Sequence, residues 1–131
     1  MKHLIPFLLI AACSTALAET PQQIAAAYAT AQGAGFHASA ARGGEFFARK
    51  FGVSEKMQSC STCHTANPAL PGQHAITSKT IKPLAPAANA DRLTDTAKVE
   101  KWFTRNCKEV VGRECTAGEK ADFVTFLTEA R

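Results

Sequence analysis

The sequence predicts an all-α fold in a single domain. Four segments carry apolar residues at the three- and four-residue spacing of amphipathic helices, and the 131 residues fit one domain. A proline-rich segment over residues 65–92 divides the second helical segment from the third. A loop of that length is unusual in a compact domain unless something other than the chain fills part of the core.

Residues 1–18 are typical of an export signal that leaves residues 19–131 as the mature domain. A basic head precedes an apolar run over residues 4–12 that is too short to cross a bilayer, and residues 16–18 (Ala-Leu-Ala) suit a cleavage site. We therefore expect a soluble periplasmic protein with no stable membrane insertion. The residues leading to Cys13 also resemble a lipoprotein cleavage box, which would leave the chain lipid-anchored through Cys13.

Capping residues predict the first two helices. Thr20, Pro21 and Gln23 supply an N-cap, a first-turn proline and a capping-box partner, and Gly33 is a good stop. The apolar positions of this first helix are Ile24, Ala27, Tyr28 and Ala31. Ser39 caps the second helical run, whose stripe is Gly43, Phe47 and Phe51, with Phe46 alongside. Gly43 on that stripe would allow another helix to approach closely.

The pentapeptide Cys60-Ser61-Thr62-Cys63-His64 is the attachment signal for a c-type haem. Two thiols at this spacing reach the two vinyl groups on one porphyrin edge, and His64 then lies under the ring where its imidazole can bind iron. A thioredoxin-like site would need a βαβ surround, and a zinc ribbon would need a second Cys-x-x-Cys. The chain has neither, and it carries the motif once. We expect one haem c, attached through Cys60 and Cys63, with His64 as the proximal ligand.

The long segment 65–92 is expected to wrap one face of that haem as a proline-rich loop. Within it, residues 75–77 and 79–81 predict a short β-hairpin. Lys82 and Arg92 are candidate contacts to the haem propionates because of their place in this loop.

Two further helices are predicted after the loop. The first begins near Asp95, ends at Gly112 and has the stripe Val99, Trp102, Phe103, Asn106 and Val110. Asn106 is the polar exception, and an amide on a buried stripe must find a partner or destabilise the fold. A capping box from Thr116 to Glu119 opens the last helix. Its stripe is Phe123, Val124, Phe126, Leu127 and Ala130.

The axial position opposite His64 is left open by the residues alone. Met57, the one methionine of the mature chain, precedes the motif and is expected to pack rather than to bind iron. The remaining candidates are His37, His74, Asn106, a lysine or an open site.

Cys107 and Cys115 are the cysteines that neither the leader nor the haem accounts for. In an oxidising compartment they would form a disulfide that stabilises the fold by about 2.6 kcal/mol, with two free thiols as the alternative. The formal charge of +4 falls to +3 when the leader is removed. No lysine-rich block is present, so nucleic-acid binding is not supported.

The C-terminal half also carries a family resemblance. The residues concerned are Ile81-Lys82-Pro83-Leu84-Ala85-Pro86, Arg92, Thr94-Asp95, Val99-Glu100-Lys101-Trp102-Phe103, Arg105-Asn106-Cys107 and Gly112-Arg113-Glu114-Cys115. With them, the chain from about residue 39 onward resembles the sphaeroides haem protein family, small monohaem cytochromes c with a class I-like helical fold. The resemblance implies Asn106 as the sixth iron ligand and a Cys107–Cys115 bridge. In the related cytochrome c double-prime, histidine has the distal role.

The resemblance further implies electron exchange with a dihaem cytochrome c and binding of O₂. An amide oxygen is a hard donor that prefers ferric iron, so reduction should release Asn106 and open a site for O₂, NO or CO. One alternative is a haem enzyme acting on peroxide, NO or hydroxylamine, for which His37, His74 and Arg105 are the obvious acid–base or cationic candidates. The other is a plain electron carrier with iron six-coordinate in both oxidation states.

Overall fold

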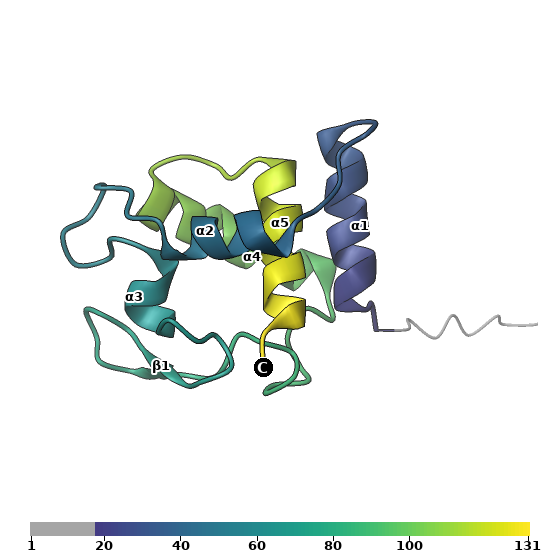
Figure 1. Ribbon diagram of the computed structural model, residues 1–131. Coiled ribbons are helices and arrows are strands. Elements are labelled where there is room, and N and C mark those ends of the chain that lie inside the picture. Colours follow the sequence, from purple (N-terminus) through teal and green to yellow (C-terminus); the bar gives the residue numbers. More distant parts are fainter. Residues whose placement is uncertain (1–17) are drawn as a thin grey trace, which may run out of the picture.

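The computed structural model describes residues 18–131, so the predicted export signal lies outside the described residues apart from Ala18. The elements are α1 (Pro21–Gln32), α2 (Ala40–Ala48), α3 (Cys60–His64), β1 (Gly72–Gln73), β2 (Thr80–Ile81), α4 (Thr96–Asn106), η1 (Cys107–Val111) and α5 (Ala117–Glu129). Figure 1 shows α5 lying between α1 and α2, with α3 at the far side of α2 from α1. Among the described helices, none has the length and apolarity that a bilayer crossing requires.

Helix α1 begins and ends as predicted. Thr20 and Gln23 form the capping box, Pro21 occupies the first turn, and Gly33 ends the helix. Ile24 and Tyr28 are buried against α5, as expected, but Ala25 is buried where the stripe predicted Ala27 and Ala31. The contact with α5 runs along the Ile24–Ala25–Tyr28 edge, which turns Ala27 and Ala31 toward solvent.

Helices α2 and α5 cross closely at Gly43. A Cβ built at Gly43 would overlap the backbone carbonyl of Asp122 on α5, so only glycine fits this crossing. Phe47, one turn later, is 2% exposed and packs on Phe126 with ring centroids 5.3 Å apart. The predicted close approach at Gly43 is confirmed, and α5 is the partner.

Replacing Gly43 by alanine should therefore lower the free energy of unfolding by about 2 kcal/mol or more, because the overlap is with backbone that cannot rotate away. Gly44→Ala is the matched control, since a Cβ there meets only the ring edge of Phe126, at 3.2 Å. Denaturant unfolding of both variants measures the difference. Equal stabilities would contradict this account of the crossing.

A cluster of aromatic side chains and cysteines joins α2 to the end of α4. Phe46, Cys107 and Cys115 are buried together, and the half-buried residues around them are Phe51, Phe103, Val111 and Phe123. Phe51 was predicted to continue α2, but α2 ends at Ala48 and Phe51 lies in the following loop. The Phe51 amide donates to the Gln58 carbonyl at 2.9 Å, which closes the loop and leaves the ring packed on Phe46.

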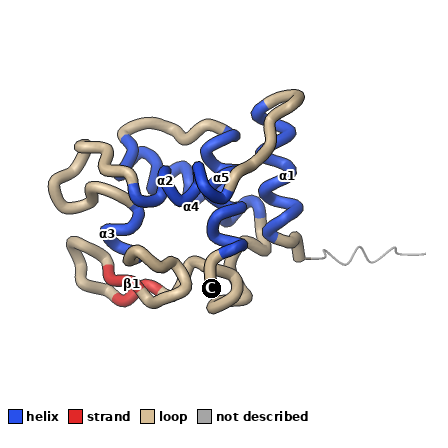
Figure 2. Tube along the Cα trace, viewed as in Figure 1, coloured by secondary structure: helices blue, strands red, loops and turns tan. Residues whose placement is uncertain are grey.

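The predicted hairpin exists, but its first strand is placed earlier than expected. Gly72 pairs with Ile81 and Gln73 pairs with Thr80 in an antiparallel ribbon. Residues 75–77 are instead part of the turn, because the His74 amide bonds to the Lys79 carbonyl at 2.8 Å. Figure 2 shows this ribbon in red below α3, joined to tan loops on both sides.

Candidate haem site

The haem-attachment motif forms a helix of its own, α3. Cys60 and Cys63 are three residues apart on this single turn, so both thiols lie on one side of it, and His64 completes the turn. Both cysteines are free thiols and half-buried. Ser59, 5% exposed, fixes the start of α3 through the bond from its amide to Thr62 Oγ1 at 3.3 Å.

Burial sets the protonation of these groups. Burial raises the pKa of the Cys60 thiol to about 11. For His64, burial lowers the pKa to about 4, and the positive charge of Arg92 adds to the effect. His64 is therefore neutral at pH 7, which is the form of imidazole that binds a metal.

The β-ribbon is seated directly on α3. Gly72 is buried, and a Cβ built on it would overlap the Cys63 carbonyl. Two residues past β1, the Ala75 amide donates to Cys63 Sγ at 3.4 Å. At the other end of the ribbon, the amides of Leu84 and Ala85 both donate to the Pro68 carbonyl, at 2.8 and 3.0 Å.

Arg92 holds the loop beyond the ribbon. Its Nε donates to the Pro83 carbonyl at 2.9 Å and its Nη2 to the Lys82 carbonyl at 3.0 Å. Burial lowers the pKa of this guanidinium, and within residues 18–131 no carboxylate pairs with it. Arg92 thus closes the loop through backbone carbonyls, whereas the side chain of Lys82 is exposed.

The structure divides the predicted stripe of α4 into two edges, and Asn106 is not on the edge that meets the helical core. The buried line of α4 runs through Val99, the half-buried Phe103 and Cys107, each four residues from the last. Trp102 and Asn106 form a neighbouring stripe that is exposed, with Trp102 at 47%. The predicted stripe included Trp102 and Asn106, each three residues after a core position. The residues of α4 that contact the core instead recur every four residues.

The helix does not stop at Asn106. It continues as the π-helical turn η1, in which the Gly112 amide donates to the Cys107 carbonyl at 3.0 Å, and Gly112 closes it with φ = 82°. The Cys107 and Cys115 sulfur atoms lie at disulfide distance, with Cα atoms 5.7 Å apart. This contact fastens η1 to the residues that precede α5, directly beside Asn106.

The other candidate distal residues lie in other parts of the structure. His37 is exposed in the α1–α2 connection, where its carbonyl accepts from Arg42 Nη2 at 2.7 Å. His74 lies on the ribbon, and its Nδ1 accepts from the amides of Ile76 and Thr77 at 3.2 and 3.3 Å. Arg105 stacks over Trp102 and pairs with Glu109 at 3.0 Å. The structure does not gather these three side chains into a shared acid–base cluster.

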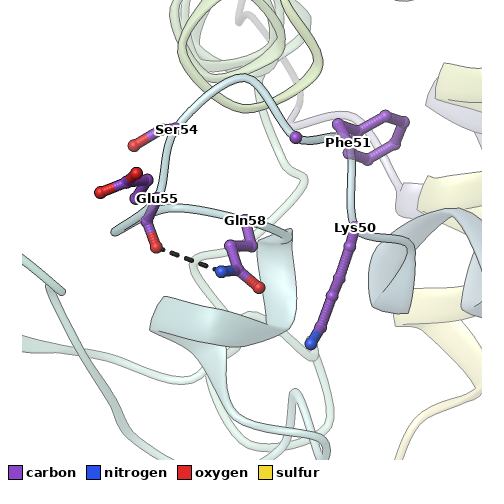
Figure 3. Close-up of a pocket in the computed structure, with 6 residues that line it drawn as sticks. Lys50, Phe51, Ser54, Glu55 and Gln58 are labelled. Carbon is purple, nitrogen blue, oxygen red and sulfur yellow. Dashed lines mark hydrogen bonds between the residues drawn. The ribbon is translucent and has the colours of Figure 1, made fainter.

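A surface hollow of about 400 Å³ lies in the loop before α3. Figure 3 shows Ser54 and Glu55 on one limb of this loop and Lys50 on the other. Gln58 Nε2 donates to the Glu55 carbonyl at 3.3 Å. The hollow is open to solvent and lies in the loop that leads into α3. None of the predicted haem-binding side chains lines it.

Comparison with known proteins identifies the chain's relatives. A family model described as a domain of unknown function (DUF1924) matches residues 33–127. The cytochrome c-type protein SHP of Cereibacter sphaeroides is 48% identical over 109 residues, which cover 82% of each chain. The chain belongs to the family of SHP and cytochrome c''. Cytochrome c'' of Methylophilus methylotrophus is 47% identical over 83 residues, covering 63% of this chain and 58% of the relative.

Solved structures from this family share the fold. The structure of oxidised SHP, described as an oxygen-binding cytochrome c, aligns with a TM-score of 0.76 over 82% of this chain and 95% of that one. Oxidised cytochrome c'' aligns with a TM-score of 0.77 at 37% identity, over 85% and 94% of the two chains. The protein is a helical cytochrome c of the SHP and cytochrome c'' family, and its cofactor is haem c.

The residues of this family member fit a covalently held haem. Two free thiols lie on one turn, a neutral imidazole follows them, and an exposed amide stands at the end of α4. Among residues 18–131, no three His, Cys, Asp or Glu side chains cluster as a metal site. Cys60 and Cys63 would hold the haem covalently and His64 would bind its iron, which would supply redox and ligand-binding chemistry.

Two site features escaped the sequence analysis. Gly72 and Ala75 fasten the ribbon to Cys63, and Gly72 was the available signal, because a glycine in a strand often marks a place where another backbone approaches closely. The π-helical turn left no mark in the spacing, since Asn106, Cys107 and Val110 also suit an α-helix.

Proposed function

We propose that this protein is an exported monohaem cytochrome that transfers single electrons and, when reduced, exchanges Asn106 for O₂ or another diatomic ligand. Residues 1–18 would be the export signal and residues 19–131 the mature periplasmic domain. Cys60 and Cys63 would attach the haem, His64 would bind iron from one side and Asn106 from the other. A dihaem cytochrome c is the proposed electron partner.

The observation that carries the proposal is the position of Asn106. Its side chain is exposed at the last turn of α4, and within residues 18–131 it makes no hydrogen bond. Its amide oxygen is therefore available to an external metal. SHP, at 48% identity, is described as an oxygen-binding cytochrome c, which supports the same ligand chemistry for this chain.

When bound, haem c supplies an iron centre that cycles between ferric and ferrous states. The amide oxygen of Asn106 is a hard donor and binds ferric iron better than ferrous iron. Asn106 should therefore occupy the sixth coordination position of the ferric iron and leave it on reduction. The proposed Cys107–Cys115 disulfide restrains η1. Asn106 could then move a short distance from the iron and return to it.

The enzyme alternative has weaker support. Catalysis on peroxide, NO or hydroxylamine would call for a polar or cationic side chain free to act on a bound ligand. The side chains of His74 and Arg105 are held by neighbouring groups, and His37 lies exposed in the α1–α2 connection. The plain-carrier alternative differs only in whether Asn106 leaves on reduction.

Optical spectra of the wild-type protein in both oxidation states test the proposal. We expect a low-spin ferric spectrum and a ferrous spectrum that is high-spin and changes at once on adding CO. A ferrous protein that stays low-spin and does not bind CO would contradict release of Asn106 and favour the plain electron carrier. Steady-state turnover of peroxide or NO would favour the enzyme.

A further inference from the structure

We propose that Trp102 distinguishes O₂ from CO by donating a hydrogen bond from its indole N–H to O₂ in the position that Asn106 leaves. The inference rests on the proposed function, in which a diatomic ligand replaces Asn106, and it adds the residue that sets the preference between ligands. Trp102 and Asn106 lie on the same exposed edge of α4, and Trp102 is 47% exposed.

Trp102 is the neighbour of Asn106 on the preceding turn of α4. Residues four apart on an α-helix lie one above the other, with Cβ atoms about 5–6 Å apart. Helical side chains also lean toward the N-terminus of their helix, so the Asn106 amide leans over the turn that carries Trp102. A ligand that replaces Asn106 would take the place of its amide oxygen, and the indole would therefore be its neighbour.

The other side chains one turn away from Asn106 are not hydrogen-bond donors. Phe103, three residues earlier, is apolar and packs on the aromatic cluster. Glu109 and Val110, three and four residues later, are an acceptor and an apolar residue. Trp102 is thus the donor that the helix places one turn from the proposed ligand position.

Arg105 restrains the indole without covering its N–H. The Arg105 guanidinium lies over the ring of Trp102, 5.9 Å from the ring centroid, and Arg105 Nε donates to Glu109 at 3.0 Å. A cation over the face of an indole is attracted to it, whereas the N–H lies at the edge of the ring. Among residues 18–131, no group accepts a hydrogen bond from this N–H. The donor is therefore held by its neighbours and available to a ligand.

The chemistry of the two gases predicts the discrimination. O₂ on ferrous iron draws electron density onto its outer atom, which then accepts a hydrogen bond, whereas CO stays nearly apolar. Hydrogen-bond donors beside the ligand therefore favour O₂. Trp102 should slow the release of O₂ and leave the binding of CO almost unchanged.

Trp102→Phe tests the donor, because phenylalanine keeps an aromatic ring and has no N–H. Tyr28→Phe is the matched control, since it also removes a polar group from an aromatic ring. The Tyr28 hydroxyl is buried near Glu100 and makes no hydrogen bond within residues 18–131. Laser photolysis of the ferrous CO form of each holoprotein, in buffer that contains O₂, gives the rates of binding and release of both gases.

Trp102→Phe should release O₂ about tenfold faster than the wild type, as expected for the loss of one hydrogen bond. Its CO rates should match those of the wild type, and Tyr28→Phe should match the wild type with both gases. The ferric spectrum of Trp102→Phe should also be that of the wild type, because the indole does not hold Asn106 on the iron.

Unchanged O₂ release in Trp102→Phe would overturn the proposal. Equal changes in the O₂ and CO rates would also overturn it, because they would show that the indole only limits the space for a ligand. An altered ferric spectrum would assign Trp102 to the placement of Asn106 instead. If the ferrous wild type bound neither gas, the proposed function itself would be wrong, whereas a wild type that binds both gases leaves that function standing whatever Trp102→Phe does.

Discussion

Replacing Asn106 by valine is expected to leave haem covalently attached but to convert ferric iron to a five-coordinate or water-ligated form. Valine is close to asparagine in size and has no donor atom. Because an internal ligand competes with any external one, ferric affinity for azide should rise at least about tenfold. Optical spectroscopy and an azide titration measure the two effects.

Thr104→Val is the matched control, since Thr104 is exposed on the same turn of α4 and the change places the same β-branched residue there. Its spectrum and azide affinity should equal those of the wild type. Asn106→His supplies a stronger donor and should keep the iron low-spin in both oxidation states, without CO binding. A wild-type ferric spectrum in Asn106→Val would show that another residue is the ligand.

Loss of both motif cysteines should have the other large effect. In Cys60→Ala/Cys63→Ala the haem can be held only by its axial ligands and by packing, so it should be extracted completely by acidified organic solvent. In the wild type two thioether bonds should keep it on the polypeptide through denaturing electrophoresis. Haem staining of the gel, with the extracted fraction measured by absorbance, gives the result.

Ser61→Ala, between the two cysteines, is the control for this experiment. Among residues 18–131, the Ser61 hydroxyl bonds only to Ser59 Oγ, at 2.8 Å, and its loss should leave attachment intact. The single variants Cys60→Ala and Cys63→Ala should each keep one thioether and one free vinyl group, which shifts the pyridine haemochrome band. Haem that stays on the double variant would mean that other residues attach it.

The sequence predicted the helices well because their ends are encoded locally. Thr20, Ser39, Asp95 and Thr116 each cap the helix that follows, and Gly33 and Gly112 end helical segments. Local capping chemistry needs no knowledge of the rest of the fold. Phe51 and the first strand of the ribbon were misplaced because bonds that close loops, from Phe51 to Gln58 and from His74 to Lys79, decide where those segments turn.

The site was predictable where a motif fixes the chemistry and less so where packing does. Cys60, Cys63 and His64 follow from one pentapeptide, whereas the exposure of Asn106 depends on which edge of α4 meets the core. Apolar spacing predicted one stripe on α4, which the structure divides into two edges. The contacts of Phe103 and Cys107 with the aromatic cluster show which edge meets the core.

The π-helical turn at Cys107–Val111 bears on how relatives should be aligned. Such a turn accommodates one residue more than an α-helix of the same length, so every side chain after it is rotated by about 100° from its α-helical position. Removing one residue between Lys108 and Val111 would restore the α-helical register and turn Gly112 away from Val53, which it now faces. A relative with a single-residue gap at this point would therefore keep its residue at position 106 but could not keep the Cys107–Cys115 pairing without rebuilding the corner.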